Sequence, residues 1–84
     1  MANTFELIFV INGAPFTLEG NPYQPLHAAI SQALAQSGNS GRPASEWIAR
    51  SPSGDELNQR SRVADLGLPS GSQVYLSLTS GVGG

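Results

Sequence analysis

The sequence has 84 residues, of which 39% are hydrophobic and 12% charged, so it fits one small folded domain rather than a disordered segment. A net charge of −2 without any Lys argues against nucleic-acid binding, which needs a basic face. The absence of Cys excludes disulfides and thiol nucleophiles, and a single His, His27, argues against a metal site or a Ser–His catalytic pair.

The chain begins with the pattern of a β-hairpin. Residues 5–11 are rich in β-branched and aromatic side chains, which favour a strand. Asn12-Gly13 follow, and both residues tolerate the positive φ of a two-residue hairpin turn. Residues 16–19 then alternate between apolar and polar, and Gly20 begins a break in the pattern. We therefore expect two antiparallel strands.

An amphipathic helix is predicted over residues 25–36. Its apolar residues recur at helical spacing along one face: Leu26, Ala29, Ile30, Ala33 and Leu34. Pro25 suits the first turn of a helix, and Gly38 suits a stop just after its end. We expect the apolar stripe to lie on the hairpin.

The second half of the chain is rich in turns and contains further strands. Residues 47–49 predict a short strand, and Leu57 lies on a brief expected return strand. Residues 73–78 form the last strand, with the even-numbered side chains pointing inward. This element order predicts an α+β, β-grasp fold, in which a mixed sheet of four to five strands has one helix packed across one face.

Several segments share, in the same order, the pattern of a known family. They are the hairpin with Ile8-Phe9-Val10 and residues 16–19, then Trp47-Ile48-Ala49, residues 62–68, and the final strand followed by Gly83-Gly84. Together they resemble ubiquitin and its relatives over nearly the whole chain. The absence of Lys makes a divergent bacterial ubiquitin-like modifier the closest resemblance. It implies a ubiquitin-like domain over residues 1–78 and a C-terminal tail over residues 79–84.

The resemblance implies a protein modifier that is not itself an enzyme and has no catalytic residue of its own. The carboxylate of Gly84 would be adenylated by an activating enzyme, carried as a thioester and conjugated to a target protein. Gly83 provides clearance beside it, since glycine has no Cβ. ATP is used by the partner enzyme, and the chain itself binds no cofactor or metal. The expected flexible arm consists of Thr79, Ser80, Gly81 and Val82.

The partners implied by the resemblance are activating and conjugating enzymes, target proteins, and a peptidase that matures or removes the modifier. No nucleic acid or membrane is expected as a partner. The Cys-free composition suits the cytoplasm. Ubiquitin's activating enzyme reads arginines in the tail, whereas this chain has Thr79, Ser80 and Val82 there. Recognition by a eukaryotic activating enzyme is therefore not expected.

The first strand is apolar on both faces, so alternation leaves its orientation open. If Ile8 and Val10 face the helix, the neighbouring side chains project from the open face of the sheet. The candidate partner-binding face then consists of Leu7, Phe9, Ile48, Tyr75 and Ser77. In the alternative arrangement, Leu7 and Phe9 belong to the core. Trp47 and Ile48 alternate, and the sequence does not decide which of them faces inward. The core is the favoured place for Trp47, and an exposed Trp47 would be a binding anchor.

Two further functions remain open at this point. A sulfur carrier of cofactor biosynthesis, with a C-terminal thiocarboxylate, shares the fold and the diglycine. A non-covalent ubiquitin-like adaptor domain would use only the open face and would not need Gly84. The segment 54–68 resembles ubiquitin more than the shorter equivalent in sulfur carriers. Without Lys, any chain of modifiers must grow through the amino terminus or a hydroxyl.

Overall fold

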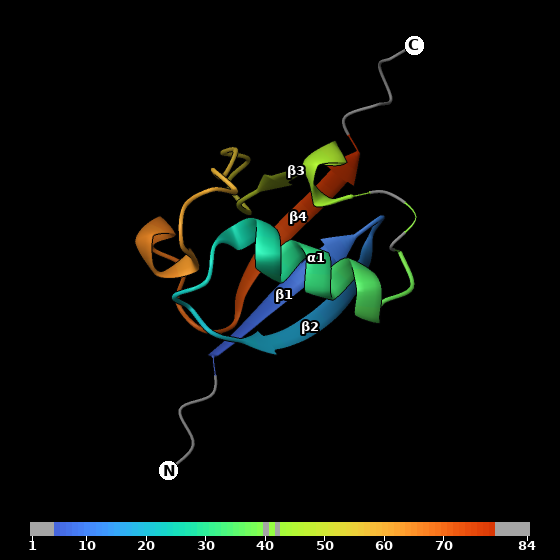
Figure 1. Ribbon diagram of the computed structural model, residues 1–84. Coiled ribbons are helices and arrows are strands. Elements are labelled where there is room, and N and C mark those ends of the chain that lie inside the picture. Colours follow the sequence, from blue (N-terminus) through green and yellow to red (C-terminus); the bar gives the residue numbers. More distant parts are fainter. Residues whose placement is uncertain (1–4, 40, 42, 79–84) are drawn as a thin grey trace.

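The computed structural model describes residues 5–39, 41 and 43–78 and shows a four-stranded mixed sheet with one helix across one face (Figure 1). The strands are β1 (Phe5–Ile11), β2 (Ala14–Gly20), β3 (Trp47–Arg50) and β4 (Ser72–Leu78). Their spatial order is β2-β1-β4-β3. The β1–β4 pair is parallel, and the β1–β2 and β3–β4 pairs are antiparallel. This is the β-grasp fold that the element order predicts.

A two-residue turn joins β1 to β2 and fixes their register. Asn12 and Gly13 have φ of 52° and 83°, so both central residues of the turn have the positive φ of a type I′ hairpin. Such a turn places Phe9 directly opposite Phe16 and Leu7 opposite Leu18. Residues that are directly opposite lie on the same face of the sheet, so the turn decides which side chains share a face.

The helix α1 (Leu26–Gln36) begins against a loop from the second half of the chain. Pro25 is its N-cap residue and offers no side-chain hydrogen bond. The first two N–H groups of the helix instead donate to the backbone carbonyls of Ser61 and Gln59, each at 2.9 Å. These bonds satisfy donors that a helix start leaves unpaired, and they tie the helix to the loop.

The end of α1 is closed by a glycine. Gly38 has φ of 82°, a left-handed conformation that is unfavourable for residues with a Cβ. The backbone N–H of Asn39 then donates to the carbonyl of Leu34 at 2.7 Å, which is the long bond of a Schellman motif. The helix stop predicted at Gly38 is therefore confirmed.

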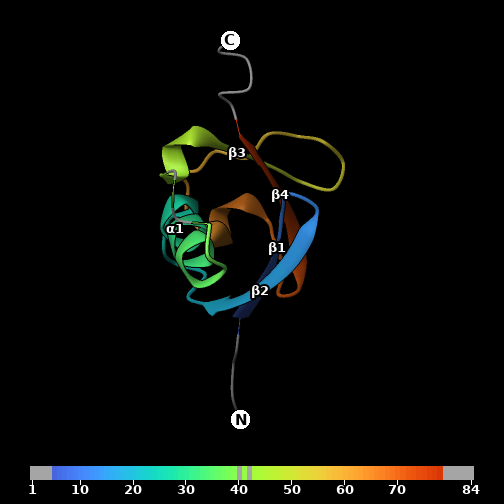
Figure 2. The ribbon, with the colours of Figure 1, turned by 90° about the vertical axis from the view of Figure 1, so that its right-hand side faces the viewer.

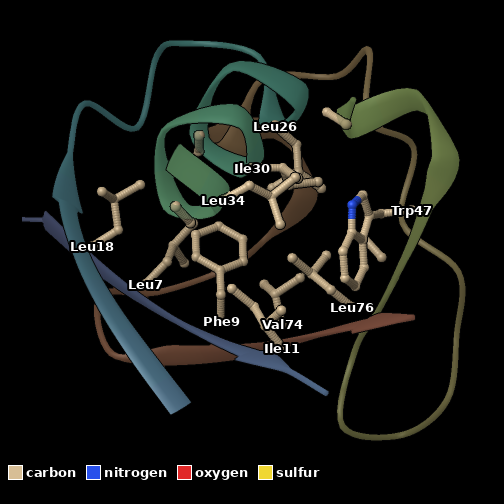
Figure 3. Close-up of a cluster of buried hydrophobic side chains, with 14 of the residues drawn as sticks. Leu7, Phe9, Ile11, Leu18, Leu26, Ile30, Leu34, Trp47, Val74 and Leu76 are labelled. Carbon is tan, nitrogen blue, oxygen red and sulfur yellow. The ribbon is translucent and has the colours of Figure 1, made fainter. Parts of the chain in front are cut away.

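One hydrophobic core fills the space between α1 and the sheet (Figure 3). Leu26, Ile30 and Leu34 point from the helix toward the sheet. Burying a side chain of this size contributes about 1.5–3 kcal/mol to folding. The buried side chains that the sheet contributes are Leu7, Phe9, Ile11, Leu18, Trp47, Ala49, Val74 and Leu76.

The segment between β3 and β4 contains less regular structure than predicted. The expected return strand at Leu57 is reduced to one bridge between Arg50 and Glu56, beside a hydrogen bond from the Leu57 N–H to the Ala49 carbonyl at 2.8 Å. Two 3₁₀ turns complete the described chain, η1 (Ala44–Glu46) and η2 (Val63–Leu66). Figure 2 shows that the loop after β3 projects on the side of the sheet opposite α1.

Candidate functional site

The face of the sheet that is turned away from α1 carries no helix among the described residues (Figure 2). Residues that are directly paired across neighbouring strands lie on the same face of the sheet. Val10 pairs with Tyr75, and Tyr75 pairs with Arg50, so these three side chains lie on this face together. We call this surface the open face. Its residues are Glu6, Ile8 and Val10 of β1, Pro15, Thr17 and Glu19 of β2, Ile48 and Arg50 of β3, and Gln73, Tyr75 and Ser77 of β4.

The centre of the open face is apolar. Ile8, Val10 and Ile48 are half-buried on it, and Tyr75 is 41% exposed. An exposed aromatic side chain flanked by aliphatic neighbours is a common anchor in protein interfaces. The centre of the open face therefore has the composition of a contact surface.

Polar groups surround this centre and hold its side chains in place. The Tyr75 hydroxyl donates to Oε1 of Gln73 at 3.2 Å. On the neighbouring strand, Nη1 of Arg50 donates to the Ser77 hydroxyl at 3.4 Å. Both bonds are exposed, so they orient the side chains but contribute little to the free energy of folding.

The structure corrects the sequence prediction for two residues of the partner-binding face. Leu7 and Phe9 are 3% and 0% exposed and belong to the core, where they face α1. Their places on the open face are taken by Ile8 and Val10, which the same prediction had turned inward. The hairpin register causes this, because Phe16 and Leu18 face the helix and their direct partners must do the same.

The other three predicted residues do lie on the open face. Ile48 and Ser77 are directly opposite each other in the β3–β4 pair, and Tyr75 is on the same side of β4. Sequence reasoning missed the two β1 residues of this face, Ile8 and Val10. The length of the Asn12-Gly13 turn was the signal that would have identified them.

Acidic side chains occupy both ends of the open face. At one end, Glu6 and Glu19 are directly opposite each other in the β1–β2 pair. At the other end, Glu56 is opposite Arg50 in the isolated bridge, and Asp55 precedes it in the projecting loop. The apolar centre is therefore bounded by carboxylates in two directions.

The predicted conjugation end follows β4 in the sequence. Strand β4 ends at Leu78, which is 37% exposed. The residues Thr79, Ser80, Gly81, Val82, Gly83 and Gly84 lie outside the described residues. The structure therefore locates the point from which this segment starts, at the end of a central strand of the sheet.

Two further residues named in the sequence analysis lie away from the open face, and Trp47 is in the core as expected. Trp47 is 4% exposed and packs in the core beside Leu76 (Figure 3), and its Nε1 is buried without a hydrogen-bond partner in the described structure. His27 is exposed near the start of α1.

The part of the chain that the structure describes contains no group of three or more His, Asp or Glu side chains arranged to hold a metal ion. No helix in that part is long and apolar enough to cross a membrane.

The fold of this chain is ubiquitin-like, and two solved structures show the likeness. A de novo design based on ubiquitin superimposes with a TM-score of 0.75 at 17% identity, covering 92% of this chain and 90% of the design. The ubiquitin of Caldiarchaeum subterraneum gives a TM-score of 0.72 at 19% identity, covering 90% and 94% of the two chains. At these identities the likeness concerns the fold.

The chain belongs to the family described as "Protein of Unknown function (DUF2604)", whose model matches residues 1–84. It is also 37% identical over 79 residues to "Uncharacterized protein y4jI" of Sinorhizobium fredii. That similarity covers 94% of this chain but only 61% of the relative, so the chain spans less than two thirds of the relative's length.

Proposed function

We propose that this protein is a ubiquitin-like protein modifier of bacterial type, which is joined to target proteins through Gly84. The observation that carries the proposal is the ubiquitin-like β-grasp domain whose last strand leads, in the sequence, into Gly83-Gly84. In a longer precursor, a peptidase would first have to cut after Gly84. The proposal concerns this chain and extends to the whole of its longer relative only as a hypothesis.

The chemistry requires a partner enzyme, because a carboxylate is a poor electrophile. An oxygen of the Gly84 carboxylate attacks the α-phosphorus of ATP, and pyrophosphate leaves. An enzyme thiol then attacks the carbonyl carbon, and AMP leaves to give a thioester. An amine or hydroxyl of the target finally attacks the thioester, and the thiol is released as the amide or ester forms.

The chain's own contribution is to present its end. Residues 79–84 can span at most about 20 Å when fully extended, a reach that allows the folded domain to dock outside a narrow enzyme site. The two glycines have no Cβ to obstruct ATP or the attacking thiol. In this proposal, the open face around Ile48 and Tyr75 contacts the activating and conjugating enzymes.

The decisive experiment is mass spectrometry of the affinity-tagged protein, purified under denaturing conditions from its native host. We expect a ladder of heavier species whose digests contain Gly84 joined to a target side chain. Treatment with mild base distinguishes an ester, which is cleaved, from an amide. Gly84→Ala removes the ladder, whereas the matched variant Gly41→Ala, where a Cβ would meet no atom within 4 Å, keeps it.

Two other results would replace the proposal. A single species in which sulfur substitutes one carboxyl oxygen would identify a sulfur carrier. An unmodified protein whose partner binding is the same with and without Gly84→Ala would identify a non-covalent adaptor. The adaptor is the second candidate because the apolar centre of the open face, with Tyr75 41% exposed, offers a contact surface that does not depend on Gly84.

A further inference from the structure

The charged residues of this protein are distributed unevenly between its two layers. Helix α1 contains no Asp, Glu, Lys or Arg, so its own side chains add no formal charge to that side of the molecule. The sheet, in contrast, carries acidic residues at both ends of its open face. This segregation means that a partner meets a different electrostatic potential on each side of the molecule.

At the first end of the open face, two carboxylates oppose each other. Glu6 and Glu19 are a direct cross-strand pair, which places their Cβ atoms about 4.5–5.5 Å apart. Like charges in such a pair destabilise a sheet. Neither side chain forms an ion pair with a cation in the described part of the chain. The repulsion is therefore not relieved within the described domain, but a cation from outside would relieve it.

At the second end, the open face carries one cation, Arg50, close in the strand pairing to two carboxylates. Arg50 is directly opposite Glu56, and its guanidinium donates to Ser77. Asp55 adds a further carboxylate in the loop that projects beyond the open face in Figure 2. The balance of charge at this end is therefore also acidic.

Between the two ends lies the apolar centre formed by Ile8, Val10, Ile48 and Tyr75. An apolar centre with a charged rim is the usual anatomy of a protein interface, and the charge of the rim selects the partner of opposite charge. An acidic rim repels phosphates, so nucleic acids and anionic lipids do not fit this face.

We propose that the open face is a docking surface for a basic partner protein, one that inserts an aliphatic or aromatic side chain between flanking Lys or Arg residues. The partner's cations would sit over the Glu6–Glu19 pair and beside Glu56. This inference goes beyond the conjugation chemistry and does not depend on it, since it holds for a modifier and for an adaptor alike.

A peptide pair tests the charge of the partner. The probe is an amphipathic helical peptide with Leu on one face and Lys on the other, about four turns long, which gives about 21 Å. Strand β1, with seven residues, extends over about 23 Å, so the lengths match. The control peptide has Glu in place of every Lys. In ¹⁵N NMR titrations, we expect the Lys peptide to shift the amide signals of Ile8, Val10 and Tyr75, and the Glu peptide to bind at least tenfold more weakly.

A pair of variants separates a specific site from general attraction. Glu6→Gln/Glu19→Gln raises the net charge by two at the open face, and we expect it to weaken binding of the Lys peptide about five- to tenfold. Gln32→Lys/Gln36→Lys raises the net charge equally at exposed positions of α1 and should change the dissociation constant less than twofold. NMR spectra of both variants show whether they are folded.

The proposal is overturned by any of four results. These are no binding of the Lys peptide, equal binding of both peptides, equal weakening by the two double variants, or signal changes on α1 instead of the open face. Tyr75→Ala adds a readout of the apolar anchor, with an expected loss of about tenfold or more in affinity. Since conjugation plays no part in these titrations, their failure would leave the proposed function of Gly84 standing.

Discussion

The two faces of strand β1 contain similar apolar residues but play different structural roles. On the inner face, Phe9 and Val74 are fully buried under α1. On the outer face, Val10 and Tyr75 pair with each other across the same two strands and remain partly exposed. Hydrophobicity alone therefore does not tell core from surface in β1. The partner strands decide, because only one of their faces is apolar.

The strongest test of this difference is a pair of truncations one residue apart. Phe9→Ala should lower the free energy of unfolding by about 3–5 kcal/mol, because it leaves a large cavity in the core. Ile8→Ala should cost only about 1 kcal/mol, since Ile8 is half-buried and its removal leaves no enclosed space. Urea denaturation measures both values. Equal losses would show that the two faces of β1 are not distinct.

A smaller loss in the free energy of unfolding is expected at the Asn12-Gly13 turn, which decides which side chains of β1 face the helix. Gly13 has φ of 83°, so Gly13→Ala places a Cβ in a left-handed conformation and should cost about 1–2 kcal/mol. Gly41→Ala is the control, since Gly41 lacks a positive φ and has space for a Cβ, and its stability should be nearly unchanged. Thermal and urea denaturation compare the two. A neutral Gly13→Ala would mean that the turn does not hold the register.

The smallest expected effect is a gain in stability on the open face. Glu19→Gln removes one of two opposing carboxylates and should stabilise the protein by about 0.2–1 kcal/mol at low salt. The gain should disappear at about 1 M salt, where the screening length falls to about 3 Å. The double variant Glu6→Gln/Glu19→Gln should be little more stable than Glu19→Gln alone, because the first substitution already removes the repulsion between the two carboxylates. Additive gains from the two substitutions would argue against a direct repulsion.

Most of the fold follows from local sequence patterns. Strand β1 occupies the predicted residues 5–11, and α1 starts one residue after the predicted position and ends at the predicted one. These elements have strong local signals, namely the turn dipeptide and the helical stripe. The prediction of a return strand at Leu57 was wrong, because the pairing beside β3 consists of a single bridge. A local sequence pattern does not indicate how many residues of two segments will pair.

The candidate site was predicted less well than the fold. Ile48, Tyr75 and Ser77 were assigned to the open face, where they lie, but Leu7 and Phe9 are in the core. The acidic ends of the face depend on which strands are neighbours, and the Glu6–Glu19 pair appears only once the register is known. The assignment of Gly83 and Gly84 remains a prediction, since these residues lie outside the described part of the chain.

The parallel pairing of β1 and β4 has a mechanical consequence. Because the two strands run in the same direction side by side, Phe5 and Leu78 lie at opposite ends of the central ladder (Figure 1). A force that pulls these two residues apart loads the hydrogen bonds between β1 and β4 in shear, all together rather than one after another. Single-molecule stretching would measure this resistance. A machine that unfolds the protein by pulling on these two ends would have to break this ladder as a whole.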